Sequence, residues 1–381
     1  MLLEILSKKA GKKVSPGEFV EVDVDLMLSH ENTDLVIEKF IECGKPLHNP
    51  GKIFIVLDHR APAESEATAE LHARIRKFVK ENGILHFYDV GSGICHEVLA
   101  ESGLLSPGMF ILGTDSHTPT AGHASAIGYA VGATEMAFAW ATGKIYFEVP
   151  EIQCVEVLGR AGKEVYPFDV ALHILSSLGL ENEHLGFELS GSYIDRISTG
   201  GKKTLCNMLV ETGAVTVYVG KSRGGKKSKV EVGEVERVVA VPPLPSNIRP
   251  VSDVRGTKID QVFVGTCTSG RIEDIGVVAR VLKNRKVHSE VRMIVAPATR
   301  NVLIEALKRG YIKTLVNAGC LILPPGCGPC LGAHLGLLGE GEICLSAGNR
   351  NYQGRMGSKD AKIYLGSPYT CAKSAIAGEI E

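Results

Sequence analysis

Apolar and polar positions alternate along the chain in a pattern that predicts strands followed by amphipathic helices. The run "KIFIVL" (52–57) predicts a buried strand, and "SEATAELHARIRKFVKENG" (65–83) predicts a helix that ends at Gly83. The same succession of strand and helix recurs in 261–265 with 271–283, and in 291–297 with 299–311. Regular alternation of strands and helices is typical of layered α/β folds. The chain is therefore predicted to be an α/β protein.

Two stretches interrupt the alternation and predict domain boundaries. One break is expected near "FEVPEIQC" (147–154), and a linker is expected at "VPPLPSNIRPVS" (241–252), which has four prolines in twelve residues. Between them, the basic, glycine-rich stretch 220–233 is interpreted as a solvated hairpin tip rather than a nucleic-acid contact. A chain of 381 residues is long enough for two or three domains at about 150 residues each.

Composition and charge narrow the class of protein. The chain is 44% hydrophobic and 22% charged, which is ordinary for a globular protein, and its net charge of −1 gives no electrostatic reason to expect nucleic-acid or membrane binding. No apolar run approaches the roughly 20 residues of a membrane span. The N-terminus "MLLEILSKKAGKK" is too charged for a secretory signal and predicts an amphipathic helix. We therefore expect a cytoplasmic protein.

Ten cysteines without the dense spacing of a disulfide scaffold raise the question of which of them are reactive. Most, including Cys43, are expected to be small core residues. Cys327 and Cys330 differ, because they lie in the loop "PPGCGPCLG" (324–332) among glycines and prolines. A redox pair is typically placed at a helix start early in a βαβ unit, and a zinc site needs further close Cys or His ligands. Zinc binding by these thiols stays an alternative.

Cys267 lies in a similar glycine-rich loop and is the natural companion of that pair. Three thiolates fit an iron–sulfur cluster in which one iron has no protein ligand. Three loops in all follow an apparent strand and contain reactive side chains: Asp58 with His59, Asp115 with Ser116 and His117, and Cys267. Ligands of open α/β sheets gather at the carboxyl ends of strands, so this placement predicts a functional site.

The sequence resembles the aconitase superfamily, most closely the group formed by the large subunits of isopropylmalate dehydratases and homoaconitases. The resemblance covers nearly the whole chain and rests on eight motifs in family order: "VDLMLSHENT" (24–33), "VLDHRAP" (56–62), "GSGICH" (91–96), "GTDSHTPTAGHASAIGYAVGATEMAFAWATGKIYFEVP" (113–150), "TLCNMLVETGA" (204–214), "VGTCTSGRIED" (264–274), "AGCLILPPGCGPCLG" (318–332) and "SAGNRNYQGRMG" (346–357). It implies three α/β/α domains, 1–151, 152–246 and 247–381, around a cluster-bearing cleft. The fourth, swivelling domain of single-chain aconitases has no counterpart in this sequence.

The resemblance also implies a cofactor and its surroundings. Cys267, Cys327 and Cys330 match the ligands of a 4Fe–4S cluster with one iron not ligated by protein. Asn207 and Asn349 match asparagines beside that cluster, where they tune it.

Substrate-binding residues follow from the same motifs. Arg350 and Arg355 match arginines of the substrate site, and a planar guanidinium grips a carboxylate with two hydrogen bonds. Ser116 matches a serine that contacts a substrate carboxylate, and His30 matches another position of the site. Two His–carboxylate pairs and two further groups are implied to be catalytic: Asp58 with His59, Asp115 with His117, His96 and Glu211. Such pairs set the pKa of the imidazole for proton transfer.

The implied reaction is that of a hydro-lyase, which dehydrates and rehydrates a hydroxy acid. The expected substrate is 3-isopropylmalate, in leucine biosynthesis, with homoaconitate or a citraconate-type acid as alternatives. The missing domain implies a separately encoded small subunit that contains the swivelling domain and the serine base, and hence a hetero-oligomer. An RNA-binding role, known among aconitase relatives, is disfavoured by the near-neutral charge.

Two departures from the family pattern stand out. Ser269 replaces an asparagine after the first cluster cysteine, which removes one hydrogen-bonding group and is expected to alter the cluster or substrate contacts. The segment 215–240 is shorter than in typical relatives.

Overall fold

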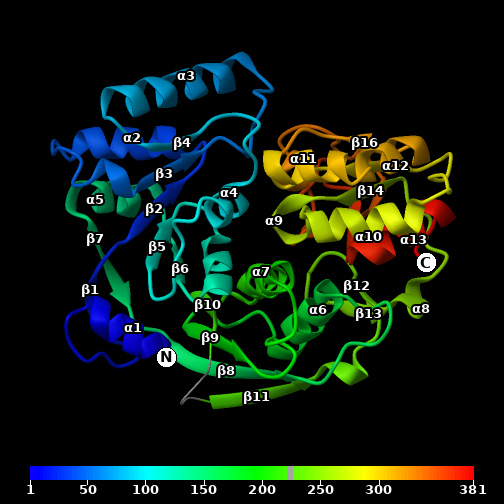
Figure 1. Cartoon of the computed structure of the whole chain (residues 1–381), viewed down its shortest axis with the longest axis horizontal. Coiled ribbons are helices and arrows are strands. Elements are labelled where there is room, and N and C mark those ends of the chain that lie inside the picture. Colours follow the sequence, from blue (N-terminus) through cyan, green and yellow to red (C-terminus); the bar gives the residue numbers. More distant parts are fainter. Residues whose placement is uncertain (221–225) are drawn as a thin grey trace.

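Four β-sheets and the helices packed on them form the described part of the chain (Figure 1). The computed structural model describes residues 1–220 and 226–381. Three of the sheets each come from one stretch of the chain, and the fourth is a two-stranded ribbon. In Figure 1 the five-stranded sheet lies at upper left, the seven-stranded sheet at right, and the four-stranded sheet below them. The division into domains 1–151, 152–246 and 247–381 stays a prediction.

The first sheet is parallel, with strand order β4-β3-β2-β5-β6. Its strands are β2 (Leu26–Ser29), β3 (Ile53–Val56), β4 (His86–Tyr88), β5 (Phe110–Gly113) and β6 (Ile127–Ala130). The helices are α1 (Leu2–Lys9), α2 (Thr33–Glu42), α3 (Glu66–Glu81), α4 (Cys95–Glu101) and α5 (Ala133–Thr142), with short 3₁₀ helices η1 (Pro50–Lys52) and η2 (Thr118–Ala124). The ribbon pairs β1 (Phe19–Asp23) with β7 (Lys144–Glu148).

Alternate residues of these strands enter different cores, which explains why the strands are apolar throughout. Ile53 and Ile55 belong to the core that also contains residues of α2, α3 and α5, whereas Phe54 and Val56 pack with residues of α4. Helices therefore cover both faces of this sheet.

The second sheet is also parallel, in the order β10-β9-β8-β11. Its elements are β8 (Glu151–Leu158), α6 (Pro167–Leu178), β9 (Leu185–Ser190), α7 (Thr199–Met208), η3 (Leu209–Thr212), β10 (Thr216–Val219), β11 (Lys226–Glu231) and η4 (Val232–Glu234). The hairpin predicted for 220–233 is wrong, because β10 and β11 lie at opposite edges of the sheet and β11 pairs in parallel with β8. Residues 221–225 of that stretch lie outside the described part of the chain.

The third sheet has the order β13-β12-β18-β17-β14-β15-β16. Its strands are β12 (Val238–Ala240), β13 (Ile248–Pro250), β14 (Gln261–Val264), β15 (Arg292–Val295), β16 (Leu321–Ile322), β17 (Ile343–Ser346) and β18 (Lys362–Gly366). Its helices are α8 (Val251–Val254), α9 (Thr266–Ser269), α10 (Ile272–Leu282), α11 (Arg300–Lys308), α12 (Tyr311–Ala318), η5 (Gly328–Leu331) and α13 (Pro368–Ala377). The predicted linker 241–252 is instead the turn and second strand of the antiparallel β12–β13 hairpin, together with the start of α8. Pro is tolerated there because the hairpin lies at the sheet edge.

Several sequence predictions are confirmed. The predicted strand at 52–57 is β3, and the predicted helix at 65–83 is α3, whose first turn is capped by the Ser65 hydroxyl accepting from the Thr68 amide. Cys43 is an exception, since it is exposed rather than part of the core.

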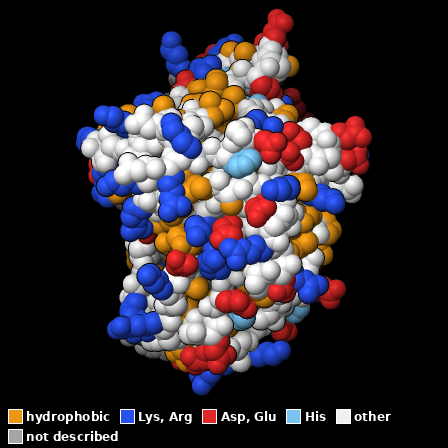
Figure 2. All heavy atoms as spheres, turned by 90° about the vertical axis from the view of Figure 1, so that its right-hand side faces the viewer, with side chains coloured by type: hydrophobic (Ala, Val, Ile, Leu, Met, Phe, Trp, Pro, Cys, Tyr) orange, Lys and Arg blue, Asp and Glu red, His pale blue; other side chains and the backbone are white. Residues whose placement is uncertain are grey.

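Among the described residues no helix combines the length and apolarity that a membrane crossing requires. On the face beside the seven-stranded sheet, basic and acidic side chains both occur, with apolar ones between them (Figure 2).

Candidate active site

A cavity of about 320 Å³ lies where loops of the first and third sheets meet. Most of the predicted site residues line it: His30, His59, His96, Asp115, Ser116, His117, Cys267, Cys327, Cys330, Asn349, Arg350 and Arg355. The remaining three, Asp58, Asn207 and Glu211, are hydrogen-bonded to residues of this lining. The structure therefore brings together residues that are more than 300 positions apart in sequence, as expected for loops at the carboxyl ends of parallel strands.

The three predicted cluster cysteines come from two loops of the third sheet. Cys267 is on α9, directly after β14, and the chain enters α9 through Thr266 with a φ of 70°, a left-handed conformation that is uncommon outside glycine. Cys327 directly precedes η5, and Cys330 lies within it. Gly332 ends this loop with a φ of 75°, and a Cβ atom there would lie 2.5 Å from the carbonyl oxygen of Arg355. Glycine thus allows the cysteine loop and the arginine loop to approach each other.

The environment of these sulfurs fits an iron–sulfur cluster. Burial, together with the neighbouring thiols of Cys327 and Cys330, raises the pKa of Cys267 well above its ordinary value. Burial raises the pKa of Cys327 to about 12. Such thiols ionise only when a metal supplies positive charge, and the thiolate is the form that ligates iron.

Amide groups already point at the sulfurs. Nδ2 of Asn207 donates to Sγ of Cys267 at 3.1 Å, and Nδ2 of Asn349 lies 3.6 Å from the same sulfur. Sγ of Cys330 is 3.8 Å from Oδ1 of Asn349. Hydrogen bonds to ligating sulfurs tune the potential of a cluster, so both asparagines are placed for the predicted role.

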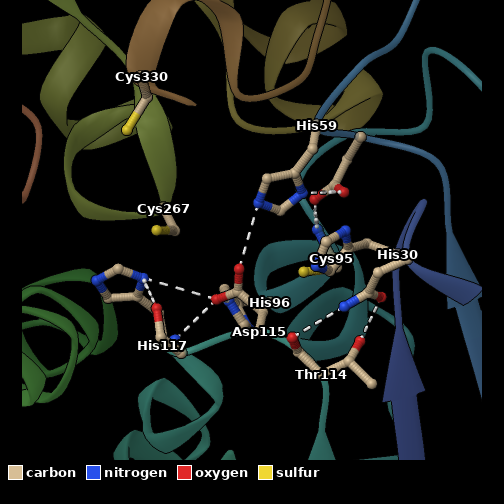
Figure 3. A network of polar contacts seen from close by, with 12 residues as sticks. His30, His59, Cys95, His96, Thr114, Asp115, His117, Cys267 and Cys330 are labelled. Carbon is tan, nitrogen blue, oxygen red and sulfur yellow. Dashed lines mark hydrogen bonds and ion pairs between the residues drawn. The ribbon is translucent and has the colours of Figure 1, made fainter. Parts of the chain in front are cut away.

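His59 lies between two carboxylates on the opposite side of the cavity (Figure 3). Its Nδ1 is 2.7 Å from Oδ1 of Asp58, and its Nε2 is 3.2 Å from Oδ2 of Asp115. Burial alone would lower the pKa of His59, but the charge of Asp58 and the bonds to both carboxylates raise it well above the ordinary value. The two carboxylates therefore favour the protonated form of His59.

Asp115 is shared by several groups. Its Oδ1 lies 2.8 Å from Nε2 of His96 and accepts the backbone N–H of His117 at 2.7 Å. Burial favours the protonated acid, but the charge of His96 and the hydrogen bonds of His117 and His59 hold the pKa of Asp115 well below its usual range. Asp115 is thus a carboxylate that bridges two histidine rings.

His117 has two carboxylate neighbours, the predicted Asp115 and also Glu211. Nε2 of His117 is 2.7 Å from Oε1 of Glu211, whereas its Nδ1 is 3.6 Å from Asp115. Glu211 also accepts from Nε of Arg350 at 2.8 Å and from the Tyr352 hydroxyl at 3.0 Å. Although burial opposes ionisation, His117 and Arg350 lower the pKa of Glu211 to about 2.

The two predicted substrate arginines differ in their partners. Arg350 is bound to Glu211, so its charge is already compensated. Arg355 lines the cavity, and its buried Nε has no hydrogen-bond partner among the described residues. A buried guanidinium N–H without a partner is costly, and a carboxylate supplies the matching acceptor pair.

Glu31 is a site residue that the sequence analysis missed. It is buried, and its carboxylate accepts the backbone N–H groups of His59 at 2.9 Å and of Arg60 at 2.8 Å. Burial raises its pKa, but the neighbouring imidazoles of His30, at 3.6 Å, and His72, at 3.8 Å, outweigh this and hold the pKa well below the usual range. The ring of His30 stacks on that of His59 at 4.2 Å. The available signal was the position of Glu31, an acidic residue two positions after the end of β2.

Ser269 does not face the site cavity. It is buried and lines a separate cavity of about 400 Å³ formed by residues of α6, α7 and α10. Ser269 would therefore not touch a substrate bound in the site cavity, so any effect of this residue on substrate contacts is indirect.

The comparisons with known proteins agree with the motifs. The model of the aconitase family (aconitate hydratase) matches residues 4–222 and 226–378. The chain is 42% identical to 3-isopropylmalate dehydratase large subunit 1 of Methanopyrus kandleri, over 100% of this chain and 97% of that protein. It is 40% identical to the methanogen homoaconitase large subunit of Methanocaldococcus jannaschii, over 99% and 98%.

A solved structure shows the same fold at low sequence identity. The holo-form of aconitase X from Thermococcus kodakaraensis superimposes with a TM-score of 0.54 at 14% identity, covering 91% of this chain and 87% of that one. With the family model matched along almost the whole sequence, the chain belongs to the aconitase family.

Proposed function

We propose that this chain is the large, iron–sulfur subunit of a 3-isopropylmalate dehydratase, a hydro-lyase that interconverts 2- and 3-isopropylmalate in leucine biosynthesis. The observation that supports this most is the single cavity that joins three cysteine sulfurs, a bridged His–carboxylate network and Arg355, whose buried Nε has no hydrogen-bond partner among the described residues. Relatives named as 3-isopropylmalate dehydratase large subunits match the whole length of the chain.

Cys267, Cys327 and Cys330 would hold a 4Fe–4S cluster with one iron free of protein ligands, and Asn207 and Asn349 would donate hydrogen bonds to its sulfur ligands. When bound, this group supplies a Lewis acid for a substrate hydroxyl and carboxylate.

The remaining residues bind the substrate. Arg355 grips one substrate carboxylate, and Ser116 and His30 line the same cavity. Arg350 is held by Glu211 and adds positive charge beside the carboxylate site. Two negative charges on a dicarboxylic substrate complement these groups.

The histidines transfer the proton at the substrate hydroxyl. The His59 imidazolium, oriented by Asp58 and Asp115, is placed to protonate the departing hydroxyl, and Asp115 keeps His96 in position. His117 with Glu211 forms the second proton-holding pair.

The partner we propose is a separately encoded small subunit that contains the swivelling domain and the serine base for the carbon-bound proton. The word "large subunit" in the names of the relatives supports it. A hetero-oligomer in the cytoplasm, with the three-domain division 1–151, 152–246 and 247–381, completes the proposal. Nucleic acid and membranes are not among the proposed partners.

Homoaconitase is the second candidate. Three relatives named as methanogen homoaconitase large subunits match this chain at 40%, 43% and 40% identity, as closely as the dehydratases do. The residues and the reaction would be the same, and only the group beyond the reacting carbons would differ. A citraconate-type acid, which has a smaller group at that position, is a further alternative substrate.

The test is an anaerobic hydratase assay of the chain with its cognate small subunit, comparing isopropylmaleate with cis-homoaconitate. Preferential turnover of isopropylmaleate supports the proposal, and preference for cis-homoaconitate replaces it by the second candidate. Omission of the small subunit should abolish turnover. Zinc without acid-labile sulfide in anaerobically purified protein would contradict the cluster.

A further inference from the structure

A buried ion network lies behind the loop of Cys267. Arg271, Glu97 and Lys203 are 5%, 2% and 8% exposed. Nη1 of Arg271 is 3.0 Å from Oε1 of Glu97, and Nζ of Lys203 is 2.7 Å from Oε2 of the same carboxylate. Charges buried to this degree are stable only when they are paired and hydrogen-bonded, so the position of each group depends on the others.

Nη1 and Nη2 of Arg271 also bind the backbone of the cysteine-bearing turn. Nη1 donates to the carbonyl oxygen of Cys267 at 2.8 Å, and Nη2 donates to the carbonyl oxygen of Thr268. The hydroxyl of Thr204 donates to the same Thr268 oxygen at 3.0 Å. These carbonyls belong to the one-turn helix α9, which is too short to supply them with N–H partners of its own. The guanidinium therefore supplies hydrogen bonds that the helix itself cannot.

The network also links the three main sheets. Glu97 is on α4 next to His96, Lys203 and Thr204 are on α7, and Arg271 directly precedes α10. One rigid group thus connects the histidine side of the site to the backbone of Cys267. Only Arg has a planar fork that reaches two carbonyls and a carboxylate at once, because Lys presents a single nitrogen.

We propose that Arg271 is a positioning residue that fixes the backbone of Cys267 and thereby sets how firmly the cluster is retained. The inference rests on the proposed function, in which Cys267 is a cluster ligand. It concerns no contact with substrate. Residues that orient metal ligands typically contribute about ten- to a hundredfold to metal affinity, so a measurable effect is expected.

The experiment compares wild type with Arg271→Lys, which keeps the charge but loses the fork, and with Thr204→Val, a milder change at the same carbonyl. Arg280→Lys is the matched control, since Arg280 is exposed on α10. After anaerobic reconstitution, iron and acid-labile sulfide are measured for each chain. Loss of the visible cluster absorbance is then followed in excess iron chelator, and circular dichroism of the cluster-free chains reports folding.

We expect cluster loss to be about tenfold faster or more in Arg271→Lys, faster to a smaller extent in Thr204→Val, and unchanged in Arg280→Lys. A folded Arg271→Lys that loses its cluster at the wild-type rate overturns the inference, even if its cluster-free form melts at a lower temperature. If Arg271→Lys does not fold, a wild-type rate in Thr204→Val has the same meaning. Failure of the proposed cluster is distinguishable, because wild type itself would then take up no iron and sulfide. Failure of the proposed substrate alone would appear in the hydratase assay and leave cluster retention unchanged.

Discussion

The imidazole Nε2 of His117 lies 2.7 Å from Oε1 of Glu211, a carboxylate 94 positions later in the chain. The contact joins the loop after β5 to η3 of the second sheet. Because Glu211 also binds Arg350, the carboxylate connects groups of all three main sheets. Burial lowers the pKa of His117, but the neighbouring Asp115 carboxylate and the hydrogen bond with Glu211 raise it above its ordinary value.

Glu211→Gln should therefore impair proton handling. The amide keeps the shape but not the charge, so the pKa of His117 is expected to fall and the protonated ring to be lost at a lower pH. We expect kcat to drop about a hundredfold or more. An NMR titration of His117 and the kcat of the reconstituted enzyme measure both effects. Exposed Glu183→Gln is the control, and an unchanged His117 pKa would contradict the assigned pair.

Substitution of each cluster cysteine by serine should remove the cluster. Cys267→Ser, Cys327→Ser and Cys330→Ser are each expected to lose most of the iron and acid-labile sulfide after anaerobic reconstitution, because a serine hydroxyl is a poor ligand for iron–sulfur clusters. The exposed Cys43→Ser should retain the wild-type content. Full iron and sulfide in any of the first three variants would remove that residue from the ligand set.

Arg355→Lys should weaken substrate binding. Loss of a charge-assisted hydrogen bond costs about 1.5–3 kcal/mol, which corresponds to roughly a ten- to hundredfold fall in kcat/KM. The effect should appear mainly in KM, since the carboxylate is gripped before and during the reaction. Exposed Arg249→Lys is the comparison. Unchanged kinetics would show that another group binds the carboxylate.

Asp169, which does not belong to the site, makes the free energy of unfolding depend on pH. Burial raises its pKa from 3.8 to about 7, so between these values the folded chain keeps a proton that the unfolded chain has released. The contribution of Asp169 to the free energy of unfolding therefore falls as pH rises from about 4 to about 7 and is level above that.

Asp169→Asn should flatten this part of the stability curve, as measured by urea unfolding of the cluster-free chain at several pH values. Exposed Asp253→Asn should keep the wild-type slope. An equal slope in wild type and Asp169→Asn would show that Asp169 is ionised in the folded chain.

Local patterns were sufficient for several strands and helices and for the loops of Asp58, Asp115 and Cys267, whereas most other site residues followed only from the resemblance to the aconitase superfamily. Hydrophobic period and capping predicted α3 and α10, since these depend on neighbouring residues. Three features depend on distant contacts: the placement of β11 beside β8, the pairing of His117 with Glu211, and the burial of Glu31 under the backbone of His59. Proline-rich sequences occur both in linkers and in hairpins at a sheet edge. The stretch 241–252 was therefore predicted to be a linker, although it belongs to the β12–β13 hairpin.

The loops of the first sheet provide only nitrogen and oxygen donors to the cavity, whereas all three sulfurs come from loops of the third sheet. Oxidation is therefore expected to affect the two walls of the cavity differently. Oxidants attack thiolates and iron, which belong to one wall, and leave the imidazoles and carboxylates of the other wall unmodified. Because those groups are held by each other, the proposed enzyme would keep the arrangement of its acid–base residues after losing iron. Reassembly of the proposed cluster from iron and sulfide would then restore the site without any change in the loops of the first sheet.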